Sequence, residues 1–359
     1  MSDRSLQRRD ILALGGTAVS TALAGCSLST LGNTNAARPA ADPPEPNASD
    51  PETEYTRLYR DALPSVVLIE TGSGRGTGFV YDDSYLVTNA HVVGQASTVD
   101  VRFSEGRWAG GDVLGRDPHS DLAAIAVDDA PANATPLPLI DGDATVGQEV
   151  VAIGNPYSLD GTVTTGIVSG IDRSIPAPTG FSIPDAIQTD APVNPGNSGG
   201  PLMSLSGNVV AVINSGGGDN IAFGISGALT RRVVPSLIET GDYDHSYLGV
   251  SFDTVSPAVA EANGLEESTG LLVVETVSGG PADGALRPSS NVRVVDGERV
   301  PVGGDVIRAI DGTEVATSED LGSYLALRTR PGDAVSLSIL REGREDTVEV
   351  DLGVRPART

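Results

Sequence analysis

The chain has 359 residues, more than one hydrophobic core usually organises, so we expect two folded domains and a leader. Aromatic residues make up only 4% and glycine occurs 44 times, which favours many short strands and turns over long packed helices. The formal net charge of −25 leaves no basic face to neutralise phosphates, which argues against nucleic acid as a partner.

The basic residues are unusual, because all 23 are arginine and no lysine occurs. Dense acidity destabilises a compact protein at low salt and is screened when salt is abundant. The composition therefore predicts a halophilic setting. An acidic protein from an ordinary environment is the alternative.

The first 26 residues have the pattern of an export signal. Arg8 and Arg9 precede a weakly apolar stretch, Ile11–Ala24, that is shorter than the roughly 20 residues a spanning helix needs. It leads into Leu-Ala-Gly-Cys, which resembles a lipobox and contains the only cysteine of the chain, Cys26. We therefore predict a twin-arginine lipoprotein signal over 1–26, with Cys26 carrying lipid on the extracytoplasmic face of the cell membrane. An ordinary buried cysteine is the alternative.

Residues 27–53 are rich in Pro, Ala, Asn, Ser and Asp, which predicts a flexible linker. A first globular domain is expected over 54–241, with one helix at Ala228–Glu239 that Pro235 can kink or shorten. Many short strands without intervening helices predict an antiparallel sandwich or barrel. The expected strands are Val66–Glu70, Gly78–Tyr81, Tyr85–Thr88, Val99–Phe103, Leu122–Val127, Val150–Ile153, Thr164–Ile171, Val209–Ile213 and Ile221–Ile225.

A second domain is expected over 243–354, and at about 110 residues it has a reasonable size for a small unit. A helix is expected around Ser318–Leu327. The expected strands of this domain are Leu271–Glu275, Asp305–Ile310, Val335–Arg341 and Thr347–Leu352.

Three short segments carry the residues of a nucleophilic site, in the chain order His91, Asp121 and Ser198. Each segment lies at the edge of a predicted strand, where a loop can present a side chain to a cleft. A serine hydroxyl becomes a good nucleophile when an imidazole accepts its proton, and a buried carboxylate must fix the tautomer of that imidazole. The order is that of the chymotrypsin-like arrangement and differs from those of subtilisins and α/β-hydrolases. We predict these three residues as a catalytic triad.

The turn around the predicted nucleophile, Gly196, Asn197 and Ser198, is followed by two further glycines. Glycines permit a turn whose backbone N–H groups point at one place, which is what an oxyanion hole requires. We expect the N–H groups of Gly196 and Ser198 to be the donors, each worth about 3–4 kcal/mol in the transition state. A simple hairpin loop is the alternative.

Few other residues could take these catalytic roles, because the chain contains only three histidines. His119 lies in a polar loop and His245 at the domain junction, so both are expected to be solvated. Asp117 is the rival carboxylate, but Asp121 directly precedes an apolar strand and should be better buried. Three scattered histidines give no metal-ligand spacing, so neither a metal nor another cofactor is expected.

These segments closely resemble the HtrA/Deg serine proteases over about residues 55–354. The resemblance implies a mostly β fold in which a chymotrypsin-like double β-barrel is followed by a single PDZ domain. It also implies unfolded polypeptides as substrates, a role in protein quality control outside the cytoplasm, and homotrimers. The matching motifs are Thr88-Asn89-Ala90-His91-Val92-Val93, Ser120-Asp121-Leu122-Ala123, Ile153-Gly154-Asn155-Pro156 and Gln188-Thr189-Asp190-Ala191-Pro192-Val193-Asn194-Pro195-Gly196-Asn197-Ser198-Gly199-Gly200-Pro201-Leu202.

The resemblance also assigns Tyr247-Leu248-Gly249-Val250 as the loop whose backbone N–H groups hold a peptide's terminal carboxylate in the PDZ domain. An ordinary strand start is the alternative. The segment Pro288–Pro301 departs from the family pattern, because it is longer than usual before the Gly304-Asp305-Val306-Ile307 strand. This insertion either alters the groove or extends a surface loop.

Cleavage specificity is partly readable, because trypsin-type enzymes carry an acidic residue six positions before the nucleophile and this chain has Pro192 there. Cleavage after Lys or Arg is therefore not expected, and the resemblance implies small or medium aliphatic residues. Two other functions remain open: a catalytically weak chaperone or peptide-binding scaffold on the same fold, and a signalling protease with one defined substrate.

Overall fold

The computed structural model describes residues 52–72, 74–155, 161–176, 182–218 and 220–356. The predicted export signal over 1–26, its Cys26, and the predicted linker up to residue 51 lie outside the described residues. Within the described ranges, no helix is both long enough and apolar enough to cross a membrane.

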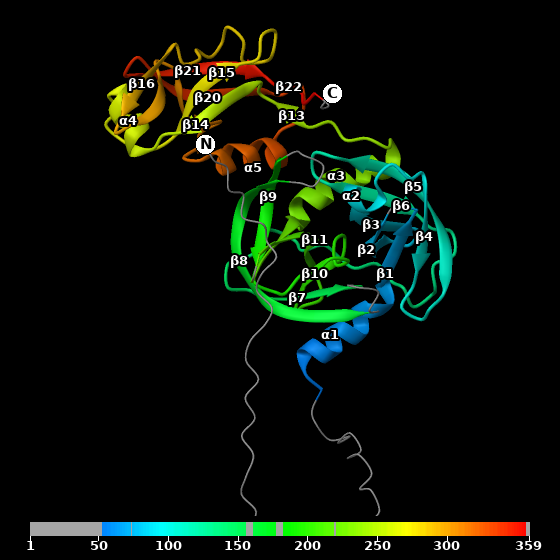
Figure 1. Cartoon of the computed structure of the whole chain (residues 1–359). Coiled ribbons are helices and arrows are strands. Elements are labelled where there is room, and N and C mark those ends of the chain that lie inside the picture. The colour runs from blue at the N-terminus through cyan, green and yellow to red at the C-terminus, as the bar shows by residue number, and fades with distance from the viewer. Residues whose placement is uncertain (1–51, 73, 156–160, 177–181, 219, 357–359) are drawn as a thin grey trace, which may run out of the picture. The chain divides into compact units, whose positions relative to one another are not determined.

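The first barrel closes in the strand order β1-β2-β3-β6-β5-β4 (Figure 1). Alternate residues of β4 point inward, with Val99 and Val101 buried, as a strand with one face on a core requires. The elements of this region are α1 (Glu54–Ala62), a 3₁₀ turn (Leu63–Ser65), β1 (Val66–Thr71), β2 (Gly74–Asp82), β3 (Tyr85–Asn89), α2 (Ala90–Val93), β4 (Thr98–Arg102), β5 (Trp108–Asp117) and β6 (Leu122–Ala126).

The second barrel closes in the order β10-β11-β12-β9-β8-β7. Buried residues of both barrels, among them Phe79 and Val212, share one hydrophobic cluster with α3. The elements here are β7 (Glu149–Gly154), β8 (Thr162–Pro176), β9 (Ser182–Thr189), β10 (Pro201–Ser204), β11 (Val209–Gly218), β12 (Ile221–Ser226) and α3 (Gly227–Glu239). The Ser226 hydroxyl caps the N-terminus of α3, which runs through Pro235 to Glu239 without being shortened.

The third sheet belongs to the C-terminal domain and has the order β14-β15-β18-β20-β21, with β19 paired to β18. The elements are β13 (Ser246–Tyr247), β14 (Val250–Thr254), α4 (Pro257–Asn263), β15 (Leu271–Thr276), β16 (Asn291–Val295), β17 (Glu298–Val302), β18 (Val306–Ile310), β19 (Thr313–Glu314), α5 (Ser318–Arg328), β20 (Ala334–Arg341), β21 (Arg344–Asp351) and β22 (Gly353–Val354). This domain and the two barrels belong to one compact unit that begins at Glu52.

The insertion between Pro288 and Pro301 folds largely into a hairpin, β16–β17, that forms a two-stranded sheet of its own. Its turn residues Asp296 and Gly297 both have positive φ, 48° and 86°, as a two-residue hairpin turn requires. Val300 is buried against α4, so one face of the hairpin packs on the domain.

The fold confirms the predicted mostly β class, but the first domain contains α1 and α2 besides the one helix expected there, and the second domain contains α4, which was not predicted. α1 packs Leu58 and Ala62 into the core. α4 begins at the capping residue Ser256 and ends at Gly264 in the left-handed conformation, φ 66°. α1 precedes the first strand and α4 lies between β14 and β15; both helices are short, and capping residues were their only local signal.

Candidate active site

His91 lies in α2, the single helical turn that follows β3 at the edge of the first barrel. Its backbone N–H donates to Oδ1 of Asp121 at 2.9 Å, and its ring Nδ1 lies 2.6 Å from Oδ2 of the same carboxylate. A proton on Nδ1 that is shared with Asp121 leaves Nε2 as the acceptor, which is the tautomer that a general base requires. The side chain is 24% exposed, so the ring is open to an incoming group on one side.

Asp121 is the last residue of the turn between β5 and β6, and it is fully buried. Its φ of 57° lies in the left-handed region, which Asp tolerates better than most residues. Its backbone carbonyl accepts from the N–H of Ala90 and from the side-chain amide of Asn89, both at 3.0 Å. These bonds fasten the turn to α2, so the carboxylate reaches His91 from a fixed direction.

Ser198 lies in the glycine-rich turn between β9 and β10 of the second barrel. Gly199 has φ 85°, and a Cβ there would collide with the Thr77 carbonyl oxygen and the Thr88 hydroxyl, so only glycine fits. The Ser198 carbonyl accepts from the N–H of Thr77 in β2 at 2.8 Å. The turn therefore rests on the strands of the first barrel that lead to α2.

Asn214 of β11 joins the two halves of the site, and sequence reasoning missed it. Its side-chain amide donates to Oδ2 of Asp121 at 2.6 Å, while its backbone carbonyl accepts from the Ser198 hydroxyl at 2.8 Å. The hydroxyl of Ser198 therefore donates to β11, and among the described residues no hydrogen bond joins it to Nε2 of His91. A polar residue directly after the apolar run Val209–Ile213 was the one signal in the sequence.

Two hydrogen bonds hold the backbone of the predicted oxyanion turn. Gly196 has φ 105°, and its carbonyl accepts from the Thr77 hydroxyl at 2.6 Å. The N–H of Asn197 donates to the Asn194 carbonyl at 3.0 Å, so this N–H is directed into the turn. This hydrogen bond occupies the N–H of Asn197, so of the three residues predicted for the oxyanion hole Asn197 is the one whose N–H is directed elsewhere.

A second His–Asp pair lies beside the first, and it corrects the expectation that His245 is solvated. Nε2 of His245 lies 2.6 Å from Oδ2 of Asp117, and the two residues are only 7% and 2% exposed. Burial by itself would raise the pKa of Asp117, but the hydrogen bond and the charge of His245, with the Ser120 hydroxyl, hold that pKa below its ordinary value. His119 is half-buried, and burial lowers its pKa to about 4, so its ring is neutral near pH 7.

The predicted carboxylate loop, Tyr247–Val250, borders a groove of about 400 Å³ that also involves Phe252 of β14 and Leu321 and Leu325 of α5. Within the loop, the Leu248 carbonyl accepts from Ala282 at 3.1 Å and the Gly249 carbonyl accepts from Val277 at 2.8 Å. Gly249 has φ 76°, which only glycine adopts without strain. Of the described residues that line the groove, none comes from the β16–β17 hairpin.

Comparison with known proteins agrees with this architecture. A trypsin-like peptidase domain matches residues 76–212, and a PDZ domain matches residues 246–352. Protease Do-like 1, chloroplastic, of Arabidopsis thaliana is 34% identical over 328 residues, which cover 85% of this chain and 73% of that protein. The chain belongs to the HtrA/Deg family of serine proteases. The predicted family is thereby confirmed.

Other members of the HtrA/Deg family are similar in sequence and in structure. A probable periplasmic serine endoprotease, DegP-like, of Rhizobium meliloti is 37% identical over 79% of this chain, but the chain spans only 54% of that relative. The HtrA-type protease AlgW with tripeptide has a solved structure that matches with a TM-score of 0.68 and 31% identity, covering 85% of this chain and 98% of that one. These names and the matched peptidase domain support the predicted class of enzyme, a serine endopeptidase.

Proposed function

We propose that this chain is an exported serine endopeptidase that cleaves unfolded or misfolded proteins with His91, Asp121 and Ser198, and that binds peptide C-termini in its PDZ groove. The observation that carries the proposal is the continuous set of hydrogen bonds from His91 through Asp121 and Asn214 to Ser198. It joins the three residue types of a triad across two barrels.

The proposed reaction begins when the Ser198 hydroxyl turns from the Asn214 carbonyl toward Nε2 of His91. The imidazole takes the hydroxyl proton while Oγ attacks the peptide carbonyl carbon, and Asp121 stabilises the imidazolium that results. The oxyanion accepts hydrogen bonds from the N–H groups of Gly196 and Ser198. His91 then gives its proton to the leaving amine, and water releases the acyl group from Ser198 by the same steps in reverse order.

The test is digestion of denatured casein at high salt by the wild-type chain and by Ser198→Ala, the matched control. We expect cleavage by the wild type alone, because the variant keeps the fold and loses only the nucleophile. Equal cleavage by both proteins would show that hydrolysis does not need Ser198 and would overturn the proposal. Suppressed aggregation of the casein without cleavage would instead favour the scaffold function.

We propose that substrates carry small or medium aliphatic residues at the cleavage site. Pro192 stands where trypsin-type enzymes have an acidic residue, and its carbonyl accepts from the Thr164 hydroxyl at 2.8 Å. A pair of peptides that differ only in Val or Arg at the cleavage position tests this specificity. Faster cleavage of the arginine peptide would contradict it.

We propose an extracytoplasmic location with a lipid anchor on Cys26 after twin-arginine export, and assembly as a homotrimer. The support is the export pattern of residues 1–26 and the word periplasmic in the names of bacterial relatives. Replacing Cys26 with Ser should release the protein from the membrane fraction. Light scattering of the purified chain tests the trimer, and a monomer at micromolar concentration would exclude it.

A further inference from the structure

The second His–Asp pair connects two segments that lie far apart in the sequence. His245 belongs to the segment between α3 and β13, and Asp117 is the last residue of β5. Their hydrogen bond spans 128 positions, and both side chains are almost completely removed from solvent. Removing the charged partner of a buried carboxylate is strongly destabilising, so the pair holds the two segments together.

Asp117 in turn holds the turn that carries Asp121. Its Oδ1 accepts from the N–H of His119 at 3.0 Å, and its Oδ2 accepts from the N–H of Ser120 at 3.1 Å and from the Ser120 hydroxyl. The turn ends at Asp121, whose left-handed backbone persists only where its surroundings hold it. The direction of the proposed catalytic carboxylate therefore depends on the position of Asp117.

His245 is itself held by its neighbours. Its ring meets Tyr243 edge-on at 4.7 Å and lies 5.2 Å from the ring of His119, while its carbonyl accepts from the N–H of Arg355 at 2.9 Å. The Tyr243 hydroxyl accepts from Nε of Arg232 in α3 at 2.9 Å. These contacts surround the imidazole, whose Nε2 faces Asp117.

His245 also lines the groove of the C-terminal domain, two residues before the carboxylate loop begins at Tyr247. His245 therefore lies at the border of the groove and also contacts Asp117, which supports the Asp121 turn. Nothing in the reaction described above uses this residue.

We propose that His245 is a positioning residue for proteolysis, which acts through Asp117 to hold the turn that presents Asp121 to His91. The inference rests on the proposed function and deepens it, because it makes the orientation of the triad depend on the segment that begins the peptide groove. Loss of the Nε2 donor allows the turn to shift, and a displacement of about 1 Å at a catalytic group can cost up to a hundredfold in rate. The substitution leaves Ser198 and its turn unchanged and acts on the orientation of Asp121, so the loss falls on kcat.

Two amide substitutions in the full chain test the proposal, because they differ only in reach. In His245→Gln the amide nitrogen takes the place of Nε2, whereas in His245→Asn it takes the place of Nδ1 and stops short of Asp117. We expect His245→Asn to lower kcat about tenfold at unchanged KM, and His245→Gln to stay within about threefold of wild type. Asp244→Asn, at the exposed neighbouring position, is the matched control and should change neither constant.

Rates are measured on an unstructured fluorogenic peptide and divided by the number of active sites, counted with a serine-reactive fluorophosphonate. Equal kcat for the Asn and Gln variants would overturn the proposal, as would an Asn variant that yields no folded protein at all, which would make the pair a folding element only. Failure of the proposed function looks different, because the wild-type chain would then neither react with the fluorophosphonate nor cleave the peptide.

Discussion

Asp117 and Asp121 stand at the two ends of one turn, and each receives a histidine nitrogen at 2.6 Å. The pairs differ in what surrounds the imidazole. The His91 side chain is 24% exposed, whereas the His245 side chain is 7% exposed and lies against the rings of Tyr243 and His119. The same hydrogen bond therefore serves two purposes, because only an imidazole with an open second nitrogen can move a proton.

Breaking the His91–Asp121 pair, whose imidazole is partly exposed, should have the largest effect. Asp121→Asn removes the charge that stabilises the imidazolium and disturbs the tautomer of His91, so we expect kcat to fall about 10³- to 10⁴-fold. The measurement is peptide hydrolysis per titrated active site. Asp83→Asn, in the exposed turn between β2 and β3, is the control. A loss smaller than about tenfold would contradict the role assigned to Asp121.

Breaking the buried His245–Asp117 pair should mainly lower the stability of the fold. Asp117→Asn leaves His245 without its buried anion, so we expect the free energy of unfolding to fall by about 3 kcal/mol near pH 7. The folded-state pKa of Asp117 lies below its ordinary value of 3.8, so the wild-type advantage is complete above about pH 4 and disappears as the pH falls through the folded pKa. Urea unfolding at high salt measures it, with Asp112→Asn as control. A difference that persists unchanged at pH 2 would contradict this cause.

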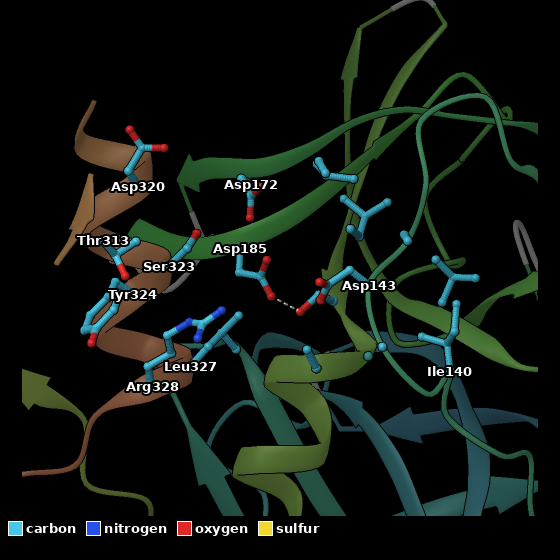
Figure 2. A pocket seen from close by; sticks show the side chains of 18 of the residues that line it. Ile140, Asp143, Asp172, Asp185, Thr313, Asp320, Ser323, Tyr324, Leu327 and Arg328 are labelled. Atoms are coloured by element: carbon cyan, nitrogen blue, oxygen red, sulfur yellow. Dashed lines mark hydrogen bonds between the residues drawn. The ribbon is translucent and has the colours of Figure 1, made fainter. Parts of the chain in front are cut away.

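Asp185, a third buried aspartate, differs from Asp117 and Asp121 because its charged neighbours are carboxylates rather than histidines. Figure 2 shows Asp185 of β9 beside the carboxylates of Asp172 and Asp143. Burial and these carboxylates raise the pKa of Asp185 to about 7, although the Ser226 hydroxyl donates to it. The folded protein thus keeps a proton that the unfolded chain loses above about pH 4, so wild-type stability falls as the pH rises from 4 to 7.

Asp185→Asn imitates the protonated form and should remove that fall. We expect it to gain about 2 kcal/mol over wild type at pH 8 and almost nothing at pH 4. Thermal unfolding at the two pH values measures the gain, with the exposed Asp141→Asn as control. A gain of equal size at both pH values would mean that the effect does not come from titration.

The smallest effect is expected at the bridge between the barrels. Asn214→Ala removes the amide that donates to Asp121 but keeps the backbone carbonyl that accepts from Ser198. His91 still orients the carboxylate, so we expect kcat to fall only about tenfold. Peptide hydrolysis measures it, with the exposed Asn133→Ala as control. An unchanged kcat would show that His91 alone is enough to hold Asp121.

Much of the fold followed from local pattern, and the exceptions have physical causes. The segment Val66–Glu70 predicted β1 almost to the residue, because its first four residues are apolar and buried. β9 was missed, because Pro184 and Asp185 interrupt its apolar pattern, and its register with β8 shifts at several places. β16 and β17 were missed as well, since their outer face is exposed and the Asp-Gly turn was the only signal.

The sequence by itself determined the chemistry of the site, since the residue types, their order and the glycines around Ser198 are local features with a direct physical requirement. Only the tertiary structure decided which polar groups meet. Asn214 and Asp121 are 93 positions apart and His245 and Asp117 are 128, and no local periodicity encodes such pairings. The closed barrels and the buried junction bring these groups together. A buried charge requires a polar partner, and the sequence pattern does not show which distant residue supplies it.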